Sequence, residues 1–198
     1  KGEINRLSKI IKPNLAVITN IAEAHLENFK NVKGIANAKS EIISNVLRGG
    51  IVILNRDDRF FNYLNKKAKL KNLKVITFGL SKKSDINLIK EKKEGEIKYV
   101  TIQVKNEIVK LRIKDINIYN VLASLAVLKE LDLDIKKTIQ LFENFLPSHG
   151  RGRVHKVKRY KKKFTLIDES YNSNPFSVKI AMNNYSKIKK GKFKKYLL

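Results

Sequence analysis

The sequence predicts an α/β fold: a mostly parallel sheet with helices on both faces, followed by the first strand and helix of a second domain. Short apolar runs alternate with longer segments of helical periodicity, which is typical of parallel strand–helix units. A segment rich in Pro and Gly, residues 146–153, interrupts this alternation. After it, an apolar run at 164–167 and a helical pattern at 176–188 begin a new unit. We therefore expect one domain over 1–153 and a second over 154–198.

The first half of the chain alternates strands and helices. An apolar run at 15–18 predicts a strand, and the periodic segment 33–47, closed by two glycines, predicts a helix. Residues 51–54 form the next apolar run, and a short helix is expected over 59–70. A third strand is expected over 74–78. Helices that connect successive strands favour a sheet covered on both faces.

The following segment changes character before the first domain ends. Residues 99–104 and 107–113 alternate around a Lys-Asn turn, which indicates an antiparallel hairpin at a sheet edge. Two helices are expected after it, over 119–131 and 135–145.

Composition narrows the class of protein. The chain has 198 residues, of which 42% are hydrophobic, enough for a packed core. No apolar run approaches the ~18 residues of a membrane helix, so we expect no membrane insertion. The absence of Cys fits a cytoplasmic protein. The chain begins with Lys1 and ends in a strand-like segment, so we expect it to be part of a longer protein.

The net charge of +25 raises the question of nucleic-acid binding, because Lys and Arg neutralise phosphates. The basic residues are mostly Lys, spread over the whole length and interleaved with Ile and Asn. The densest runs, 156–163 and 187–195, lie near the expected linker and the chain end. This distribution favours a solvated basic surface, and we expect no nucleic-acid partner.

Polar clusters follow two of the expected strands. Residues 19–27 come directly after the first strand, and residues 168–175 come after the strand of the second domain. In open α/β sheets, ligands bind beyond the carboxyl ends of the strands. The two clusters therefore predict chemistry on a polar, phosphorylated substrate.

Lys39 lies inside the apolar stripe of the helix expected over 33–47. The stripe consists of Ile35, Ala38, Ile42, Ile43 and Val46. A buried ammonium is costly, so such a lysine is paired, deprotonated or modified. The alternative is that its stem packs in the stripe while its amine reaches water. The neighbouring Glu41 is expected to face solvent.

Other polar residues have both a binding and a structural interpretation. His25, between Glu23 and Glu27, is either a metal ligand or proton shuttle, or a surface residue. Asn20 either binds a ligand or caps the loop after the first strand, and Asn120 either binds a ligand or caps the helix expected over 119–131.

The second polar cluster allows the same two interpretations. Asp168 and Glu169 suit ribose hydroxyls or a metal, and the helix start after Tyr171 and Asn174 can receive a phosphate. The alternative is that these residues only form a capped turn between strand and helix. Arg151, with Arg153 as a second choice, either clamps a phosphate between the domains or is a surface cation.

Five stretches together carry a family pattern. They are Gly2-Glu3-Ile4 and residues 19–27, 38–42, 54–58 and 168–175, with weaker support from Asn120 and Gly150-Arg151. This pattern resembles the Mur ligase family, in the branch that joins D-alanyl-D-alanine to a UDP-N-acetylmuramoyl-tripeptide. The resemblance implies the later part of a central ATPase domain followed by the start of a Rossmann-like C-terminal domain. It also implies a monomer.

The resemblance assigns roles to these residues. ATP and Mg²⁺ are the implied cofactors, with His25 and a carbamylated Lys39 as catalytic residues that bind the metal. Asn20, Asn120, Arg151, Asp168, Glu169, Tyr171 and Asn174 would bind the nucleotide. No phosphate loop of the form G-x-x-x-x-G-K-[ST] occurs in the sequence, so we expect this segment alone to be inactive. The alternatives are a sibling Mur or folylpolyglutamate-type amide ligase, or a basic nucleic-acid-binding module.

Overall fold

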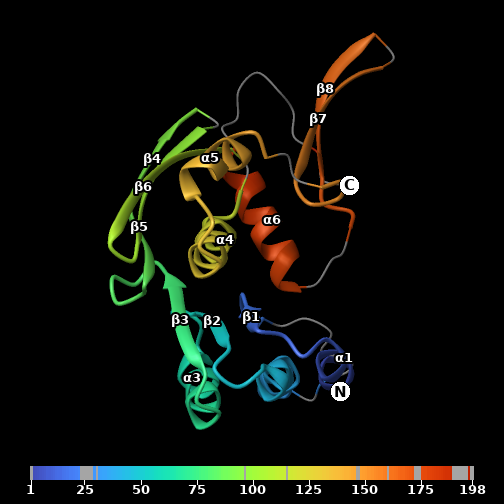
Figure 1. Cartoon of the computed structure of the whole chain (residues 1–198). Helices are drawn as coiled ribbons and strands as arrows, with labels where there is room; N and C mark the ends of the chain where they lie inside the picture. Colours follow the sequence, from blue (N-terminus) through green and yellow to red (C-terminus); the bar gives the residue numbers. More distant parts are fainter. Residues whose placement is uncertain are drawn as a thin grey trace. The chain divides into compact units, whose positions relative to one another are not determined.

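The computed structural model divides into two compact units, each described here by itself (Figure 1). The first comprises residues 1–22 and 26–146, and the second comprises 23–25 and 147–198. The structure describes residues 2–22, 29, 31–95, 97–114, 116–145, 148–159, 161–171, 175–188 and 196.

The first unit contains six strands and five α-helices within the described residues. In chain order they are α1 (Glu3–Ile11), β1 (Leu15–Ile18), α2 (Val32–Ser40), β2 (Ile51–Asn55), α3 (Phe61–Leu70), β3 (Lys74–Gly79), β4 (Ile86–Glu94), β5 (Ile97–Val104), β6 (Glu107–Lys114), α4 (Ile118–Glu130) and α5 (Ile135–Glu143), with a 3₁₀ helix, η2 (Glu41–Asn45), after α2.

The six strands form one sheet in the order β1-β2-β3-β4-β5-β6. Three of the five pairings are parallel, from β1 to β4, and the other two are antiparallel. β4 pairs with β3 only through Phe78–Ile86 and Gly79–Asn87, so the antiparallel part continues the sheet beyond the carboxyl end of β3. Figure 1 shows α4 and α5 against the concave side of β4–β6. The predicted mostly parallel α/β sheet with its antiparallel hairpin is confirmed.

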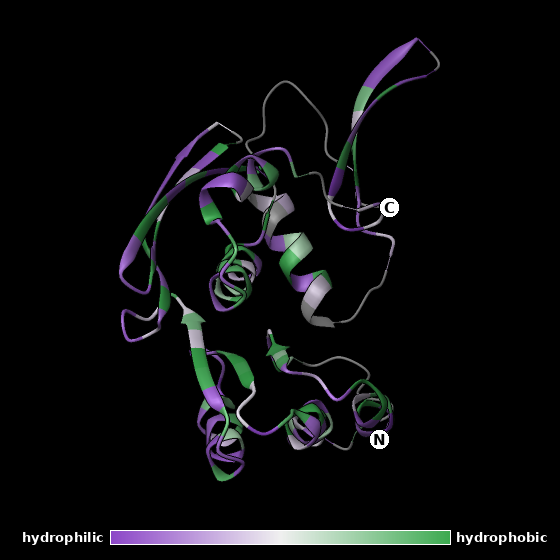
Figure 2. Ribbon diagram, viewed as in Figure 1, coloured by the Kyte–Doolittle hydropathy of each residue, from purple (hydrophilic) through white to green (hydrophobic). Residues whose placement is uncertain are grey.

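Helices cover both faces of the parallel part of the sheet. Side chains alternate along a strand, and on β2 Ile53 joins the hydrophobic cluster that contains Leu122 of α4. Its neighbours Val52 and Leu54 join the opposite cluster, with Leu64 of α3. Figure 2 shows the mainly apolar character of β1 and β2. Strands buried on both faces read as continuous apolar runs, which is why the sequence revealed them.

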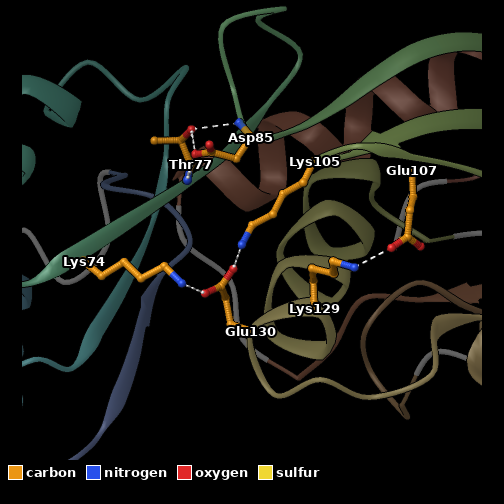
Figure 3. A network of polar contacts seen from close by, with 7 residues as sticks. All are labelled: Lys74, Thr77, Asp85, Lys105, Glu107, Lys129 and Glu130. Atoms are coloured by element: carbon orange, nitrogen blue, oxygen red, sulfur yellow. Dashed lines mark hydrogen bonds and ion pairs between the residues drawn. The ribbon is translucent and has the colours of Figure 1, made fainter.

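An ion-pair network fastens the end of α4 to the sheet (Figure 3). Lys74 of β3 lies 2.7 Å from Glu130, the last residue of α4, and Lys105 of the β5–β6 turn pairs with the same carboxylate. Burial alone would raise the pKa of Glu130, but hydrogen bonds from Lys105 and Lys74 hold it below its usual value. Lys129 pairs with Glu107 of β6. The network holds the C-terminal end of α4 on the sheet, and the first turn of α4 contacts Asp57 in the turn after β2.

The helix expected over 33–47 is shorter than predicted. It ends at Ser40 and continues as η2, and Val46 adopts extended dihedral angles. The Ser40 hydroxyl donates to the carbonyl of Asn37, a side-chain bond that competes with regular helical pairing. Two elements of the first unit were not predicted, α1 and β4. Most of β4 is exposed and charged, so it carries little apolar alternation.

The second unit contains β7 (Arg153–Arg159), β8 (Lys162–Asp168) and α6 (Pro175–Lys187). β7 and β8 form an antiparallel hairpin, so the basic run over 156–163 belongs largely to paired strands and not to a linker. Figure 2 shows how hydrophilic the outer part of this hairpin is, which hid β7 from sequence patterns. The division between the units falls at residue 146, and the predicted domain boundary at 153 stays a prediction. No helix in the described part of the chain is long and apolar enough to cross a membrane.

Candidate functional site

Polar side chains after β2 tie together the loops at the carboxyl edge of the parallel strands. Asp58 accepts hydrogen bonds from the backbone N–H of Ile21 at 2.6 Å and of Phe60 at 2.8 Å. Asn55 donates its amide to the carbonyl of Thr19 at 3.1 Å. The first polar cluster is therefore held by the turn after the neighbouring strand, as expected where parallel strands end side by side.

Asp57 extends this framework to β3 and α4. Its carboxylate accepts from the backbone N–H groups of Leu80 and Ser81 and from the Tyr119 hydroxyl, the last at 3.2 Å. Partial burial and the neighbouring Asp57 raise the pKa of Tyr119. A Cβ at Gly79 would lie 2.6 Å from Asp57 Oδ2, so only glycine allows this approach. The sequence analysis gave Asp57 and Asp58 no role of their own. Two acidic residues shortly after an apolar strand are the pattern that would have indicated one.

Lys39 points from α2 toward the end of β1. Its side chain is half-buried, and its Nζ donates to the carbonyl oxygen of Asn20 at 2.8 Å. Burial lowers the pKa of Lys39, and the charge of Asp58 opposes that shift only in part. The sequence placed Lys39 in an apolar stripe, and the structure brings it together with Asn20.

The two asparagines predicted to bind a ligand are exposed. Asn20 lies in the loop after β1, and Asn120 lies in the first turn of α4. Asn117, not Asn120, is the N-cap of α4, because its side chain accepts from the N–H of Tyr119 at 2.9 Å. The capping alternative for Asn120 is therefore wrong.

Glu41 corrects another expectation. The residue does not simply face solvent, because its two carboxylate oxygens accept from the backbone N–H groups of Gly2 and Asn5, both at 3.1 Å. These amides belong to the first turn of α1, where a negative charge is favourable. Glu41 therefore fastens α1 to the segment that follows Lys39.

In the second unit, Asp168 organises the turn that carries Arg151. Its carboxylate accepts from the N–H of Gly150 at 3.0 Å and from the N–H and hydroxyl of Ser170 at 3.1 and 2.6 Å. Hydrogen bonds from Ser170 and Gly150 lower the pKa of Asp168. Gly150 adopts a φ of +73°, and a Cβ there would lie 2.5 Å from the backbone nitrogen of Tyr171. The segments 150–152 and 168–171 are therefore held together by backbone contacts.

Arg151 and Tyr171 meet on this turn. The Arg151 guanidinium lies 4.1 Å from the centre of the Tyr171 ring, a cation–π contact. Desolvation, followed by the charge of Asp168, raises the pKa of Glu169. The structure thus gathers Arg151, Tyr171, Asp168 and Glu169 on one turn, and their role in nucleotide binding stays a prediction. His25 and Asn174 lie outside the described residues, as do Glu23 and Glu27.

Each of the two groups of residues, taken by itself, offers side chains that bind polar ligands. A guanidinium stacked on an exposed phenol suits phosphate, and carboxylates at a strand end suit ribose hydroxyls. A half-buried lysine of lowered pKa is chemically reactive, because more of it is in the neutral amine form. The donor set is consistent with ATP chemistry.

Comparison with known sequences gives a family match. The model of the Mur ligase middle domain matches residues 1–128. The UDP-N-acetylmuramoyl-tripeptide–D-alanyl-D-alanine ligase of Rickettsia prowazekii is 31% identical over 95% of this chain and 42% of its own length. The UDP-N-acetylmuramate–L-alanine ligase of Dictyoglomus turgidum is 30% identical over 87% of this chain and 37% of its own length.

Comparison with solved structures gives matches in the same family. MurF from Acinetobacter baumannii superposes with a TM-score of 0.80 and 26% identity over 92% of this chain and 39% of that protein. MurF from Thermotoga maritima, solved with ADP, gives a TM-score of 0.75 at 24% identity, over 92% of this chain and 41% of its own. The chain thus spans about two-fifths of the length of the relatives it matches.

Proposed function

This chain belongs to the Mur ligase family, and from that premise we propose that its parent protein is an ATP-dependent ligase that joins D-alanyl-D-alanine to UDP-N-acetylmuramoyl-tripeptide. The relatives named for this reaction support the choice of substrates, since one of them matches nearly the whole chain. The cytoplasmic location and the monomeric state expected from the sequence stay predictions.

The proposed reaction proceeds in two substitutions. A carboxylate oxygen of the tripeptide attacks the γ-phosphorus of ATP, so that ADP leaves and an acyl phosphate forms. The amine of D-alanyl-D-alanine then attacks the acyl carbon, the tetrahedral intermediate loses inorganic phosphate, and the amine gives up a proton. Water competes with the amine for the acyl phosphate, so the residues around it must exclude water as well as orient the amine.

The observation that carries the proposal is the environment of Lys39. The half-buried amine has a lowered pKa and lies 2.8 Å from the Asn20 carbonyl, at the carboxyl edge of the sheet. Only a neutral amine attacks CO₂, forming an N–C bond and releasing a proton. Lowering the pKa raises the neutral fraction, and the resulting carbamate replaces a cation by an anion that can hold a metal.

Mg²⁺ and the triphosphate are then proposed to bind near Lys39. His25 and the Lys39 carbamate would hold the ion, and Mg²⁺ supplies charge neutralisation on the transferred phosphoryl group. Asp58 positions Asn20, because its carboxylate accepts from the backbone N–H of the next residue, Ile21. Asn120, exposed on the first turn of α4, is proposed to bind the adenine edge.

The residues of the second unit are proposed to bind the remainder of the nucleotide. Arg151, stacked on Tyr171, would contact phosphate. Asn174, outside the described residues, is proposed to contact the nucleotide as well. Asp168 has both oxygens engaged by its own turn. We therefore assign the ribose hydroxyls to Glu169, with Asp168 as the residue that positions it.

The test uses the full-length parent and measures phosphate release from ATP with the UDP-linked tripeptide and D-alanyl-D-alanine. We expect turnover that depends on the dipeptide, rises with bicarbonate and collapses in Lys39→Ala. Lys33→Ala is the matched control, because Lys33 is an exposed lysine of the same helix. A carbamate carbon signal in ¹³C-bicarbonate, present in wild type and absent in Lys39→Ala, reports the modification itself.

The same assay separates the alternatives. Turnover with UDP-N-acetylmuramate and L-alanine, or with a folate and glutamate, in place of the tripeptide would assign the parent to a sibling ligase. Turnover that persists in Lys39→Ala would remove the catalytic role of Lys39. No turnover with any of these substrates would overturn the ligase proposal.

A further inference from the structure

Two histidines and an aspartate of the second unit converge at the base of the β7–β8 hairpin. One ligand atom each from His149, His155 and Asp168 lies within 4.8 Å of the other two. His149 is exposed, and the other two residues are half-buried. None of the proposed ligase chemistry uses either histidine.

The hairpin register explains why these side chains meet. Residues directly opposite in an antiparallel pair share a face, as do residues two apart on one strand. Arg153 pairs with Asp168 and His155 pairs with Leu166, so His155 and Asp168 lie on one face. His149 reaches that face because the following turn is bonded to β8, with Gly152 N–H donating to the Asp168 carbonyl at 2.8 Å.

Arg153 lies against the ring of His149. Its guanidinium donates to Nε2 of His149 at 3.0 Å. The two rings lie near each other, with centroids 6.0 Å apart and planes at 27°. Ligands of a tetrahedral zinc ion lie about 3.4 Å apart, given metal–ligand distances near 2.1 Å. Binding an ion therefore draws these ligand atoms closer together and displaces Arg153 from His149.

We propose that His149, His155 and Asp168 form a binding site for a borderline divalent transition-metal ion such as Zn²⁺. Two imidazole nitrogens and one carboxylate oxygen suit zinc, cobalt or nickel and do not suit Mg²⁺, which prefers six oxygen ligands. The bound ion fastens the turn of residues 149–152 onto the hairpin. Its ligands differ from those proposed for Mg²⁺ at Lys39. Asp168 is shared with the ligase proposal, where it positions Glu169; its Oδ2, which accepts from the Gly150 N–H, has a second lone pair for the ion.

Cobalt(II) is the probe, because its visible absorption reports nitrogen and oxygen ligands at a site of low coordination number. CoCl₂ is titrated into the metal-free 198-residue chain. We expect a saturable absorption change with one equivalent, which Zn²⁺ removes and millimolar Mg²⁺ does not. The change should be lost in His149→Gln and in His155→Gln. It should persist in Lys158→Gln, at an exposed position of β7.

The outcomes decide the proposal in each case. No saturable signal, its retention in either of the first two variants, its loss in Lys158→Gln or its removal by Mg²⁺ would overturn the site. Circular dichroism of the metal-free variants checks that they fold. Ring-nitrogen NMR of the wild-type chain gives a second readout: Zn²⁺ should shift the signals that are assigned to His149 and His155 by their loss in the two variants.

Discussion

The turn after β2 and the turn after β8 use the same local chemistry in different surroundings. In each, an aspartate follows an apolar strand and accepts backbone N–H groups from two segments. The Asp58 carboxylate accepts hydrogen bonds from the N–H groups of Ile21, 37 residues away, and of nearby Phe60. The Asp168 carboxylate accepts from the N–H groups of Gly150, 18 residues away, and of nearby Ser170.

The two turns differ in what lies beneath them. The first rests on strands buried by two hydrophobic clusters, with Phe78 and Leu54 fully inaccessible. Among the described residues of the second unit, no hydrophobic side chain is buried, and Phe164 and Leu166 of β8 are 49% and 42% exposed. Hydrogen bonds of one kind therefore stabilise a packed framework in one unit and a partly solvated hairpin in the other. We expect substitutions to reveal this difference.

The largest expected effect tests the packing itself. Phe78→Ala removes a buried aromatic side chain and should lower the free energy of unfolding by about 3–5 kcal/mol. Phe164→Ala, at a half-exposed position of the hairpin, should cost less than about 1 kcal/mol. Urea denaturation followed by circular dichroism measures both. Equal losses would break the comparison, because they would mean that the hairpin packs as tightly as the sheet.

The second prediction concerns the aspartates. Asp58→Ala leaves two part-buried backbone N–H groups without their acceptor and should cost about 1–3 kcal/mol. Amide hydrogen exchange should accelerate at Ile21 and Phe60. In Asp168→Ala, faster exchange should be confined to Gly150 and Ser170, because the turn is partly solvated. Glu94→Ala, at an exposed carboxylate of β4, is the control. Acceleration that spreads through β1 and β2 in Asp168→Ala would contradict this view.

The third prediction sharpens the comparison within the first unit. Burial lowers the pKa of Lys39 from 10.5, so between the lowered value and 10.5 the unfolded chain binds more protons than the folded chain. The stability that wild type has relative to Lys39→Met should therefore increase as pH rises through this range. The measurement is urea denaturation at several pH values in CO₂-free buffer, with Lys33→Met correcting for the loss of a lysine from α2. A difference that falls with pH would contradict the burial of the amine.

The smallest effect concerns the second unit. Arg153 competes with a metal ion for Nε2 of His149 and adds a positive charge beside the proposed site. Arg153→Met should therefore bind cobalt more tightly, by roughly 1.4- to fivefold, since a surface charge contributes about 0.2–1 kcal/mol. Titration of the visible absorption measures the change. Weaker binding in this variant would show that Arg153 supports the turn more than it competes for the ring.

Local patterns predicted the central fold well. β1, β2 and β3 were found as apolar runs because strands covered on both faces contain few polar residues. The β5–β6 hairpin was predicted because buried and more exposed residues alternate along both strands, one face packing on the core and the other facing solvent. α1, β4 and β7 were missed: α1 leaves Ile10 and Ile11 exposed, and both strands are rich in Lys and Glu or Arg.

The sequence by itself determined the class of fold, the two polar clusters at strand ends and the anomalous position of Lys39. These follow from the order of apolar and polar residues, which reports burial within one element. Only the tertiary structure decided that Asp57 and Asp58 hold the neighbouring loops, that Glu41 fastens α1 and that three ligand atoms meet at the hairpin. Those contacts join residues that are distant in the chain, such as Asp57 and Tyr119, 62 residues apart. Periodicity cannot report them, because the folded chain and not the local pattern sets which polar groups come within hydrogen-bond distance.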